Sequence, residues 1–350
     1  MSVLTLSGLQ SFIRYARRES ASSGRRRAEV AWELNGYEVL KPLARGKDSR
    51  LFLVRDPKTR RLVVLKRATR RSDGDHRLID RIRSEYQLSV GLRHPNIRSA
   101  LRLVQQRAWW RVNECRLVLE FIDGRTLRAH DSAKLLDLCV IFESIADALA
   151  FTHAHGVVHA DVSDRNILVG RDGTARLIDF GHAIRIGSRQ LSHSGSVESS
   201  APELVYGWTA SSATDVYGLG STMYWKFTGR RPPTAAAQRS PLGFVPDPSR
   251  LRMPIHPCAV MPGLPAELGD LIIESLQIKP ARRPTMLVVR DTLARLRYEL
   301  ENPLRRESWR RSGRATRHGA SSTPGGRLSS IARRPSSFGD SIRRRPSSVN

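Results

Sequence analysis

The hydrophobic pattern of the chain changes near Glu120, and this change constrains the fold more than any other feature of the sequence. Before it, short aliphatic runs are separated by turns such as "DPKT", which is typical of β-strands. After it, apolar residues recur at helical spacing over longer segments. The order predicts a small strand-rich lobe, joined near residues 120–123 to a larger helical lobe.

The expected elements follow from this pattern. Strands are expected over residues 37–43, 51–54, 62–66 and 115–122, and helices over 75–92, 132–156, 214–228, 268–276 and 285–301. The helix of the small lobe is expected to present one apolar face, formed by Leu78, Ile79, Ile82, Tyr86 and Val90. Residues 166–180 are expected to form a hairpin, because Asp172 and Gly173 tolerate the positive φ of its turn.

The charge of the chain is high and uneven. The formal net charge is +26, yet residues 303–350 contain twelve Arg against two acidic residues, and residues 1–30 contain six Arg against two Glu. Segments of this composition are typically disordered. We therefore expect a disordered basic leader over 1–35, a folded domain over 36–301 with lobes of about 36–120 and 121–301, and a disordered Arg/Ser-rich tail over 302–350.

The composition also limits the classes of protein to consider. Three cysteines in 350 residues do not make a disulfide framework, which favours a reducing compartment, and we expect a cytoplasmic protein. No apolar run approaches eighteen residues, so no membrane span is expected. The first residues are rich in Arg and Ser and poor in acid, so a mitochondrial transit peptide is an alternative to a basic leader.

Four polar residues occur in an order that suits phosphoryl transfer. Such chemistry needs a cation on the phosphates, oxygen ligands for Mg²⁺ and a base for the attacking hydroxyl. Lys66 ends the strand "VVLK", Asp161 and Asn166 stand five residues apart in "HADVSDRN", and Asp179 follows thirteen residues later in "DFG". A lone "DFG" is weak evidence, but its place after this loop and a hairpin makes the signal strong.

These motifs resemble those of the eukaryotic-type protein kinases over about residues 36–300. "VVLK" resembles the family's Val-Ala-Ile-Lys strand, and "HADVSDRN" resembles the catalytic loop His-Arg-Asp-Leu-Lys-Pro-Glu-Asn. "APE" at 201–203, "DVYGLG" from Asp215 and "KPARRPT" around Arg283 follow in the family's order. The resemblance implies an α+β, bilobal kinase fold, and the wording of several motifs looks like that of a bacterial member.

The resemblance also implies roles for individual residues, with ATP and Mg²⁺ as cofactors. Lys66 and Glu85 would form an ion pair, Asp161 would be the base, and Ser163 would occupy the position of a phosphate-contacting Lys. The metal ligands would be Asn166 and Asp179. The nucleotide site would include Ala44, Gly46, Lys47, Ser49, Leu51, Val64, Lys66, Glu120 and Ile122.

Further parts of the resemblance concern architecture. It implies that Asp215 braces the catalytic loop and that Arg283 pairs with Glu203. Four histidines raise the alternative of a metal site, but their spacing matches no zinc pattern and favours structural roles. These are His153, His155, His159 and His182.

The chain departs from the family pattern at three points. Only Gly46 remains of the three glycines of the phosphate loop. Ala160 replaces the Arg that binds a phosphorylated activation loop in many members, so we expect activity that does not need activation-loop phosphorylation. Ser163 replaces the catalytic-loop Lys. One lost charge-assisted hydrogen bond of about 1.5–3 kcal/mol slows transfer by about 10–100-fold without abolishing it.

Three functions fit the sequence. The first is a serine/threonine protein kinase, which the complete chemical set favours. The second is a pseudokinase that serves as a binding module or scaffold. The third is a small-molecule kinase of the aminoglycoside-phosphotransferase type, which shares "HxDxxxxN" but lacks "APE", "DVYGLG" and the "RPT" brace.

The basic tails contain four Arg-Arg-x-Ser sites that resemble substrates of basophilic kinases. The serines are Ser20, Ser308, Ser336 and Ser347. Where basophilic members often have a Glu after Tyr224, this chain has Trp225 and Lys226, so we expect another kinase to modify the tails. The Arg-rich tails also allow weak electrostatic contact with anionic partners.

Overall fold

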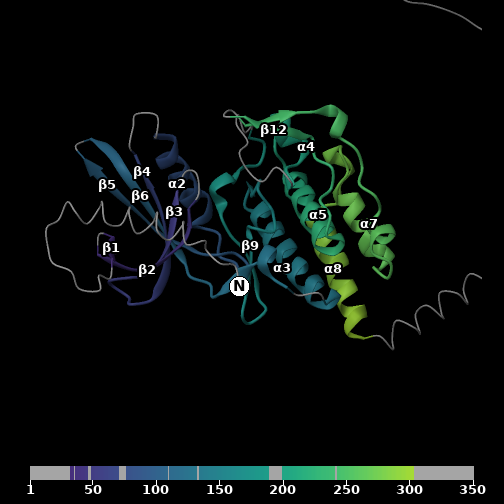
Figure 1. The fold of residues 1–350 in the computed structure, drawn as a ribbon, viewed down its shortest axis with the longest axis horizontal. Helices are drawn as coiled ribbons and strands as arrows, with labels where there is room; N and C mark the ends of the chain where they lie inside the picture. Colours follow the sequence, from purple (N-terminus) through teal and green to yellow (C-terminus); the bar gives the residue numbers. More distant parts are fainter. Residues whose placement is uncertain are drawn as a thin grey trace, which may run out of the picture. The chain divides into compact units, whose positions relative to one another are not determined.

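The computed structural model describes residues 32–34, 36–45, 49–70, 76–108, 110–131, 134–188, 199–240 and 243–302. The first lobe is a six-stranded antiparallel sheet with the strand order β1-β2-β3-β4-β6-β5 (Figure 1). Its strands are β1 (Trp32–Leu34), β2 (Tyr37–Arg45), β3 (Arg50–Arg55), β4 (Leu62–Thr69), β5 (Ala100–Ala108) and β6 (Arg111–Glu120). Helix α2 (His76–Ser89) packs against β4, β5 and β6.

The alternation of side chains along β4 divides the core of this lobe into two clusters. Val63 and Leu65 pack with Phe52, Val54 and other residues on one face. Val64 and Ala68 pack on the opposite face with apolar residues of α2. Because successive strand residues point to opposite faces, Lys66 lies on the same face as Val64 and therefore toward α2.

One detail of the expected apolar face of α2 is wrong. The helix ends at Ser89, and Val90 is 41% exposed. Ile79 and Ile82 are buried as expected, but Glu85 and Ser89 are the next buried positions of the helix. A glutamate thus occupies a core-facing position of α2, which is tolerable only because it meets a cation there.

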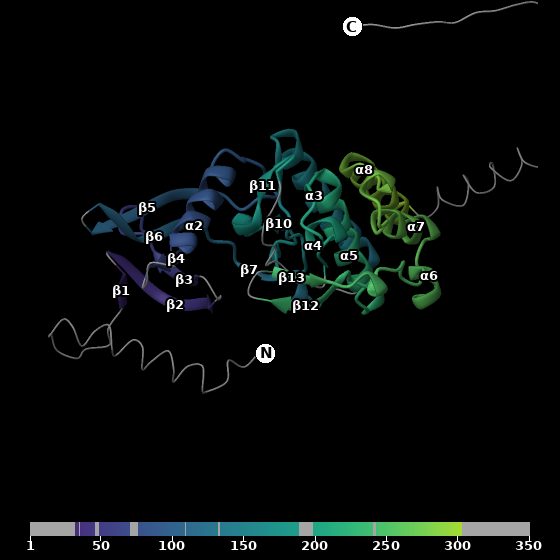
Figure 2. The same cartoon turned by 90° about the horizontal axis from the view of Figure 1, so that it is seen from above.

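The larger lobe is built mainly from helices. They are α3 (Leu135–Ala154), α4 (Pro202–Val205), α5 (Ser212–Thr228), α6 (Pro257–Val260), α7 (Ala266–Ser275) and α8 (Met286–Glu301), with the short 3₁₀ turns η2 (Leu127–Ala129), η3 (Phe180–His182), η5 (Pro248–Arg250) and η6 (Pro280–Arg282). Figure 2 shows α3, α5 and α8 beside one another, and their apolar faces form the largest core cluster. Phe142, Leu219 and Leu268 are among its fully buried side chains.

Short strands at the edge of this lobe present the loops on which the site depends. The sheet of β10 (Ala175–Leu177), β9 (Ile167–Gly170) and β7 (Gly124–Thr126) is antiparallel. The expected hairpin of β9 and β10 is confirmed, and Gly173 in its turn has φ +80. Asn166 immediately precedes β9 and Asp179 follows β10, so the hairpin brings both residues to one end of the sheet.

Two further strand pairs complete the lobe. β8 (Val157–Val158) pairs with β11 (Ile184–Arg185), and β12 (Ala236–Ser240) pairs with β13 (Gly243–Pro246). The sequence pattern did not predict the β12–β13 hairpin or strand β5. The succession of a strand-rich lobe and a helical lobe is confirmed. No helix within the described part of the chain is long and apolar enough to span a membrane.

Candidate active site

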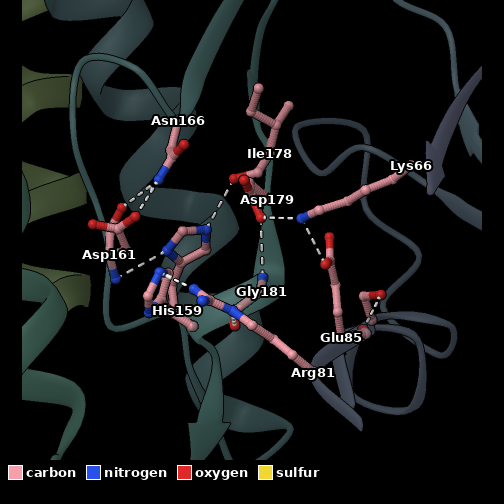
Figure 3. Close-up of polar contacts among 11 residues, drawn as sticks. Lys66, Arg81, Glu85, His159, Asp161, Asn166, Ile178, Asp179 and Gly181 are labelled. Atoms are coloured by element: carbon pink, nitrogen blue, oxygen red, sulfur yellow. Dashed lines mark hydrogen bonds and ion pairs between the residues drawn. The ribbon is translucent and has the colours of Figure 1, made fainter. Parts of the chain in front are cut away.

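Three segments bring a cation and two carboxylates together between the lobes. Lys66 lies on β4, Glu85 on α2, and Asp179 two residues after β10. Lys66 Nζ donates to Glu85 Oε2 and to Asp179 Oδ1, each at 2.7 Å (Figure 3). Lys66 and Asp179 are separated by 113 positions in the sequence. One ammonium group therefore links the sheet, the helix and the loop after the hairpin.

Burial and charge compete at each member of this cluster. Burial would raise the pKa of Asp179, but the Lys66 ammonium overcomes this effect and holds the pKa of that carboxyl well below its usual range. Burial raises the pKa of Glu85, against the opposing effect of Lys66. Burial would lower the pKa of Lys66, yet the two carboxylates raise it. Lys66 thus remains a cation in a water-poor place, as phosphate binding requires.

Arg98 adds a second cation that sequence reasoning missed. Its side chain is buried, and its charge lowers the pKa of both Glu85 and Asp179. Its backbone N–H donates to Leu177 O at 3.0 Å, and Leu177 N–H donates to Asn96 O at 2.8 Å. The segment around Arg98 is therefore fastened to the strand that leads to Asp179. The only sequence signal was an Arg that interrupts the apolar run "NIRSAL".

Helix α2 is also held to the loop that follows Asp179. Arg81 Nε donates to Gly181 O at 2.8 Å, and its guanidinium contacts the His182 ring (Figure 3). A Cβ at Gly181 would lie 3.0 Å from Asp179 Oδ1 and 3.3 Å from Lys66 Nζ, so a side chain there would require these groups to shift by a few tenths of an ångström. Glu85 and Arg81 thus fix α2 against the site at two points.

The second half of the site is the loop over 159–166. Asn166 Nδ2 donates to both the backbone oxygen and Oδ2 of Asp161, each at 2.8 Å (Figure 3). Asp161 is partly exposed, whereas Asn166 is 8% exposed. The five-residue spacing between them therefore closes a compact loop that holds the Asp161 carboxylate in place.

Asp215 of α5 holds this loop in place, as the family resemblance implied. Its carboxylate accepts hydrogen bonds from the backbone N–H groups of His159 and Ala160, both at 2.8 Å. It also contacts the ring of His153 at 2.8 Å. Ala160 has φ +60, a left-handed conformation that is unfavourable for a non-glycine residue. The two hydrogen bonds from Asp215 stabilise this conformation.

The oxygen atoms of Asp179 and Asn166 fit the preferences of Mg²⁺. Asp179 uses Oδ1 for Lys66 and for Gly181 N–H, and its side chain is 39% exposed, so the carboxylate remains accessible. Asn166 uses its Nδ2, which leaves the amide oxygen for a cation. Mg²⁺ in phosphate-transfer sites is commonly held by one or two protein ligands together with the phosphates. No group of three or more His, Cys, Asp or Glu in the described residues could hold a metal alone.

The residues expected to contact the nucleotide lie on three strands of the first lobe. Leu51 on β3 is opposite Lys66 in the register, and Val64 on β4 is opposite Leu119 on β6. Ala44 lies on β2, is exposed and pairs with Leu51. The remaining expected residues are Ser49, which precedes β3, Glu120 and Ile122 at the end of β6, and Gly46 and Lys47, which lie outside the described residues.

The Glu120 side chain is committed elsewhere. Its carboxylate contacts the Arg176 guanidinium and accepts a hydrogen bond from Ser99 N–H at 3.2 Å. Its backbone N–H donates to Ser99 O at 3.0 Å. The backbone N–H and both carboxylate oxygens of Glu120 are therefore already engaged within the protein.

Ser163 and its neighbour Asp164 are both buried. Ser163 is 1% exposed and Asp164 is 2% exposed. Asp164 Oδ2 accepts a hydrogen bond from Arg231 at 3.0 Å and lies 3.6 Å from Arg128. Ser163 thus places a small, buried hydroxyl where the family has a phosphate-contacting Lys. The carboxylate of the next residue, Asp164, is held by Arg231 and Arg128.

A second buried ion pair lies away from these groups. Arg283 donates to both Glu203 oxygens, at 2.6 and 2.9 Å, which confirms the predicted brace. Thr214 Oγ1 donates to the same carboxylate at 2.9 Å. Burial of the adjacent Tyr217 raises the pKa of its hydroxyl to about 12. The pair ties the segment "APE" to α5 and to the turn before α8.

Comparison with known proteins agrees with this geometry. A family model described as the protein kinase domain matches residues 37–293. Serine/threonine-protein kinase PrkC of Bacillus subtilis is 30% identical over 204 residues, which are 56% of this chain and 31% of that protein. Serine/threonine-protein kinase Aurora-1 of Arabidopsis thaliana is 27% identical over 237 residues, which are 64% of this chain and 75% of that protein.

A third relative comes from another bacterium. Serine/threonine-protein kinase PknA of Mycobacterium tuberculosis is 27% identical over 258 residues, which are 71% of this chain and 57% of that protein. The match with PrkC spans about a third of that protein's length. The chain belongs to the protein kinase domain family, among relatives that are serine/threonine protein kinases of bacteria and of eukaryotes.

Proposed function

We propose that the chain is an active protein kinase that transfers the γ-phosphate of ATP, with Mg²⁺, to Ser and Thr hydroxyls of protein substrates. The observation that carries this proposal is the ion cluster of Lys66, Glu85 and Asp179, whose 2.7 Å contacts hold α2 and the loop after β10 together. A protein kinase needs the Lys–Glu ion pair and the metal-binding Asp in place at the same time, here Lys66 with Glu85 and Asp179.

The residues of the chain divide the work between them. Lys66 binds and orients phosphate oxygens, while Glu85 fixes the position of its ammonium group. Asp161, held by Asn166, orients the acceptor hydroxyl and takes its proton. Asp179 and Asn166 hold Mg²⁺, which neutralises the charge of the phosphates when it is bound. Burial of the cluster strengthens each of these interactions, because the local dielectric constant is low.

We further propose that activation-loop phosphorylation is not required. Ala160 packs in a small apolar cluster with Val158, Leu204 and Ala210, so a phosphate would find no Arg at this place. The start of the activation segment is held instead by backbone hydrogen bonds: Gly187 N–H donates to Ala210 O, and Ala210 N–H donates to Ser188 O, both at 3.2 Å. These bonds tie Gly187 and Ser188 to Ala210 without any added charge.

The decisive measurement is phosphate transfer from Mg-ATP to a generic protein substrate by wild type and Asp179→Ala. We expect transfer by the wild type and its loss in the variant and in EDTA. Equal, background-level signals from both proteins would refute the proposal. Nucleotide binding without turnover would then favour the pseudokinase, which the departures at Ala160 and Ser163 keep as the second candidate. Turnover of small hydroxyl compounds but not of protein would favour the small-molecule kinase.

The independence from loop phosphorylation has its own test. Ser192, Ser194 and Ser196 lie outside the described residues, and changing all three to Ala removes the phosphate acceptors of this stretch. We expect the triple variant to retain at least about half of the wild-type kcat, because Ala160 offers no cation to a phosphate. Loss of activity, restored by changing the same serines to Asp, would show that phosphorylation is needed after all.

The extent of the domain, the location of the protein and the modification of its tails are also proposed. We propose a kinase domain over 36–301 in a cytoplasmic protein, and modification of the tails by another, basophilic kinase. The tail serines Ser20, Ser308, Ser336 and Ser347 lie outside the described residues. Incubation with ATP separates the alternatives: phosphate that appears on the tails of the wild type but not of Asp161→Ala would show that the chain modifies itself.

A further inference from the structure

Cations converge on the catalytic loop next to Asp161. Arg231 donates to Asp164 Oδ2 at 3.0 Å, and Arg128 Nη1 lies 3.6 Å from the same oxygen atom. Arg128 is also tied to the loop by its backbone, since its N–H donates to Asp164 O at 3.0 Å. Two guanidinium groups therefore meet a single carboxylate. The Arg128 side chain remains 47% exposed, and that of Arg231 is 22% exposed.

An aromatic platform holds these cations in position. The Arg231 guanidinium lies 4.3 Å from the centroid of the Trp225 ring, within the range of a cation–π contact. Lys226 Nζ lies 5.7 Å from the same ring and donates to His130 O at 2.6 Å. Side chains held in this way lose little further conformational entropy when a ligand binds, so they form a preorganised cationic surface.

Arg165 extends this surface toward the reacting hydroxyl. It immediately precedes Asn166, whose side chain contacts Asp161 at 2.8 Å, and consecutive Cα atoms are about 3.8 Å apart. Arg165 is exposed, and no described residue makes an ion pair with it. Its side chain therefore reaches solvent from the same loop as Asp161, the residue proposed to orient the acceptor hydroxyl.

We infer that Arg128, Arg165, Lys226 and Arg231, here called the cationic face, select acceptor peptides with anionic groups near the acceptor Ser or Thr. Carboxylates and phosphates both suit guanidinium groups, which bind them through paired hydrogen bonds. These four cations outnumber the neighbouring carboxylates of Asp164 and Asp131, which both act on Lys226, so the face keeps a net positive charge that attracts anionic peptides and repels basic ones. The inference rests on the proposed function, because it names the substrate class of the same site.

The face also bears on the tails of the chain. Their Arg-Arg-x-Ser sites would place two guanidinium groups near Arg165, and like charges brought together oppose binding. Autophosphorylation at these serines is therefore disfavoured in cis and in trans. A separate kinase with an acidic substrate site suits them better.

The test compares four synthetic peptides that share one Ser and differ only in its neighbours: Glu, phosphoserine, Gln or Arg. The kcat/KM of each is measured with wild type, with Arg165→Glu and with the control Arg107→Glu. Arg107 is an exposed Arg on β5 in the other lobe, so the control reverses an equal charge away from the site. Binding of the fluorescein-labelled peptides is measured in parallel by anisotropy.

We expect wild type to prefer the Glu or phosphoserine peptide over the Gln peptide by about tenfold, which corresponds to about 1.4 kcal/mol. The preference should shrink at high salt, which screens exposed charges. Arg165→Glu should bring the ratio to about one or below, and Arg107→Glu should keep the wild-type ratio. A greater effect of phosphoserine than of Glu would identify phosphorylated substrates as the preferred source of the anion.

Two results would overturn the inference. One is equal or better use of the Arg peptide by wild type, and the other is an unchanged ratio in Arg165→Glu. If no peptide is phosphorylated at all, the proposed function fails, and anisotropy still decides the nature of the face: tighter binding of the Glu peptide that is lost in Arg165→Glu supports it, and equal binding of all peptides contradicts it.

Discussion

Two ion clusters among the described residues are built alike and exposed differently. Lys66 binds Glu85 and Asp179, each at 2.7 Å, and Arg283 binds Glu203 at 2.6 and 2.9 Å. In the second cluster both side chains are at most 2% exposed. In the first, Glu85 is buried but the Asp179 side chain is 39% exposed.

The difference separates a structural cluster from a chemical one. Arg283 also donates to the backbone oxygens of Gln277, Ala213 and Ile278, so its hydrogen-bonding capacity is used within the protein. Asp179 instead uses Oδ1 internally and keeps an accessible carboxylate. A buried charge with all its partners internal can only stabilise or specify the fold, whereas one with an open side can bind a ligand.

The largest effect is expected from breaking the closed cluster. Arg283→Met leaves Glu203 as a buried charge without its cation, which should lower the free energy of unfolding by about 3–5 kcal/mol. Urea denaturation measures this change. The double variant Glu203→Gln with Arg283→Met removes the stranded charge and should recover part of the loss. A double variant no more stable than the single one would contradict this explanation.

The open cluster should respond in activity rather than in stability. Asp179→Asn keeps the shape of the side chain but removes its charge, and kcat should fall by at least about 10²–10³-fold, as for other lost electrostatic contacts in active sites. Thermal unfolding should change little. Asp172→Asn, in the exposed turn of the hairpin, is the matched control and should keep wild-type activity. A large drop in the unfolding temperature of Asp179→Asn would show that the two clusters do not differ in kind.

Arg98 allows a test of the charge balance in the open cluster, because its buried guanidinium acts on Glu85 and Asp179. Burial raises the pKa of Glu85 and the Arg98 charge lowers it, so Arg98→Met should raise that pKa further. Glu85 then binds a proton at a higher pH and loses its pairing with Lys66, so the acid limb of the kcat profile should move to higher pH. Near neutral pH we expect a loss of about tenfold, which corresponds to about 1.4 kcal/mol.

The conservative variant controls for packing around this residue. Arg98→Lys keeps the positive charge and should restore the acid limb toward that of the wild type. An acid limb that stays in place in Arg98→Met would mean that the residue merely fills space.

The smallest change in the free energy of unfolding is expected from an exposed ion pair. Arg171 and Asp123 lie 3.0 Å apart, but their side chains are 84% and 62% exposed. Solvent screens such a pair, so Asp123→Asn should change the free energy of unfolding by no more than about 1 kcal/mol. Urea denaturation checks it beside Arg283→Met. A change as large as that of Arg283→Met would show that burial is not what distinguishes the clusters.

The sequence pattern predicted those strands and helices that are set by residues near one another in the chain. The β9–β10 hairpin follows from Asp172 and Gly173, and the long helices α3, α5, α7 and α8 follow from their apolar periodicity. Val90 was placed wrongly because helical spacing does not show where a helix ends. The β12–β13 hairpin was missed because its segment lacks a run of alternating apolar residues.

The candidate site divides in the same way. Motif spacing alone places Lys66, Asp161, Asn166 and Asp179 in one chemical set. It did not reveal Arg98, Arg81 or the clamp of Arg231 on Asp164, because each is an ordinary Arg in the sequence. Their partners lie up to about a hundred positions away, and only folding brings such charges into contact.

The sequence by itself determined the succession of the two lobes and the identity of the chemical groups, because strands, helices and motifs depend on residues that are near one another in the chain. The tertiary structure alone decided which charges are sealed and which are open. That choice depends on burial, since the energy of an ion pair is governed by the water left around it. Asp179 and Glu203 are both carboxylates, and the fold makes one of them accessible to a metal ion and encloses the other.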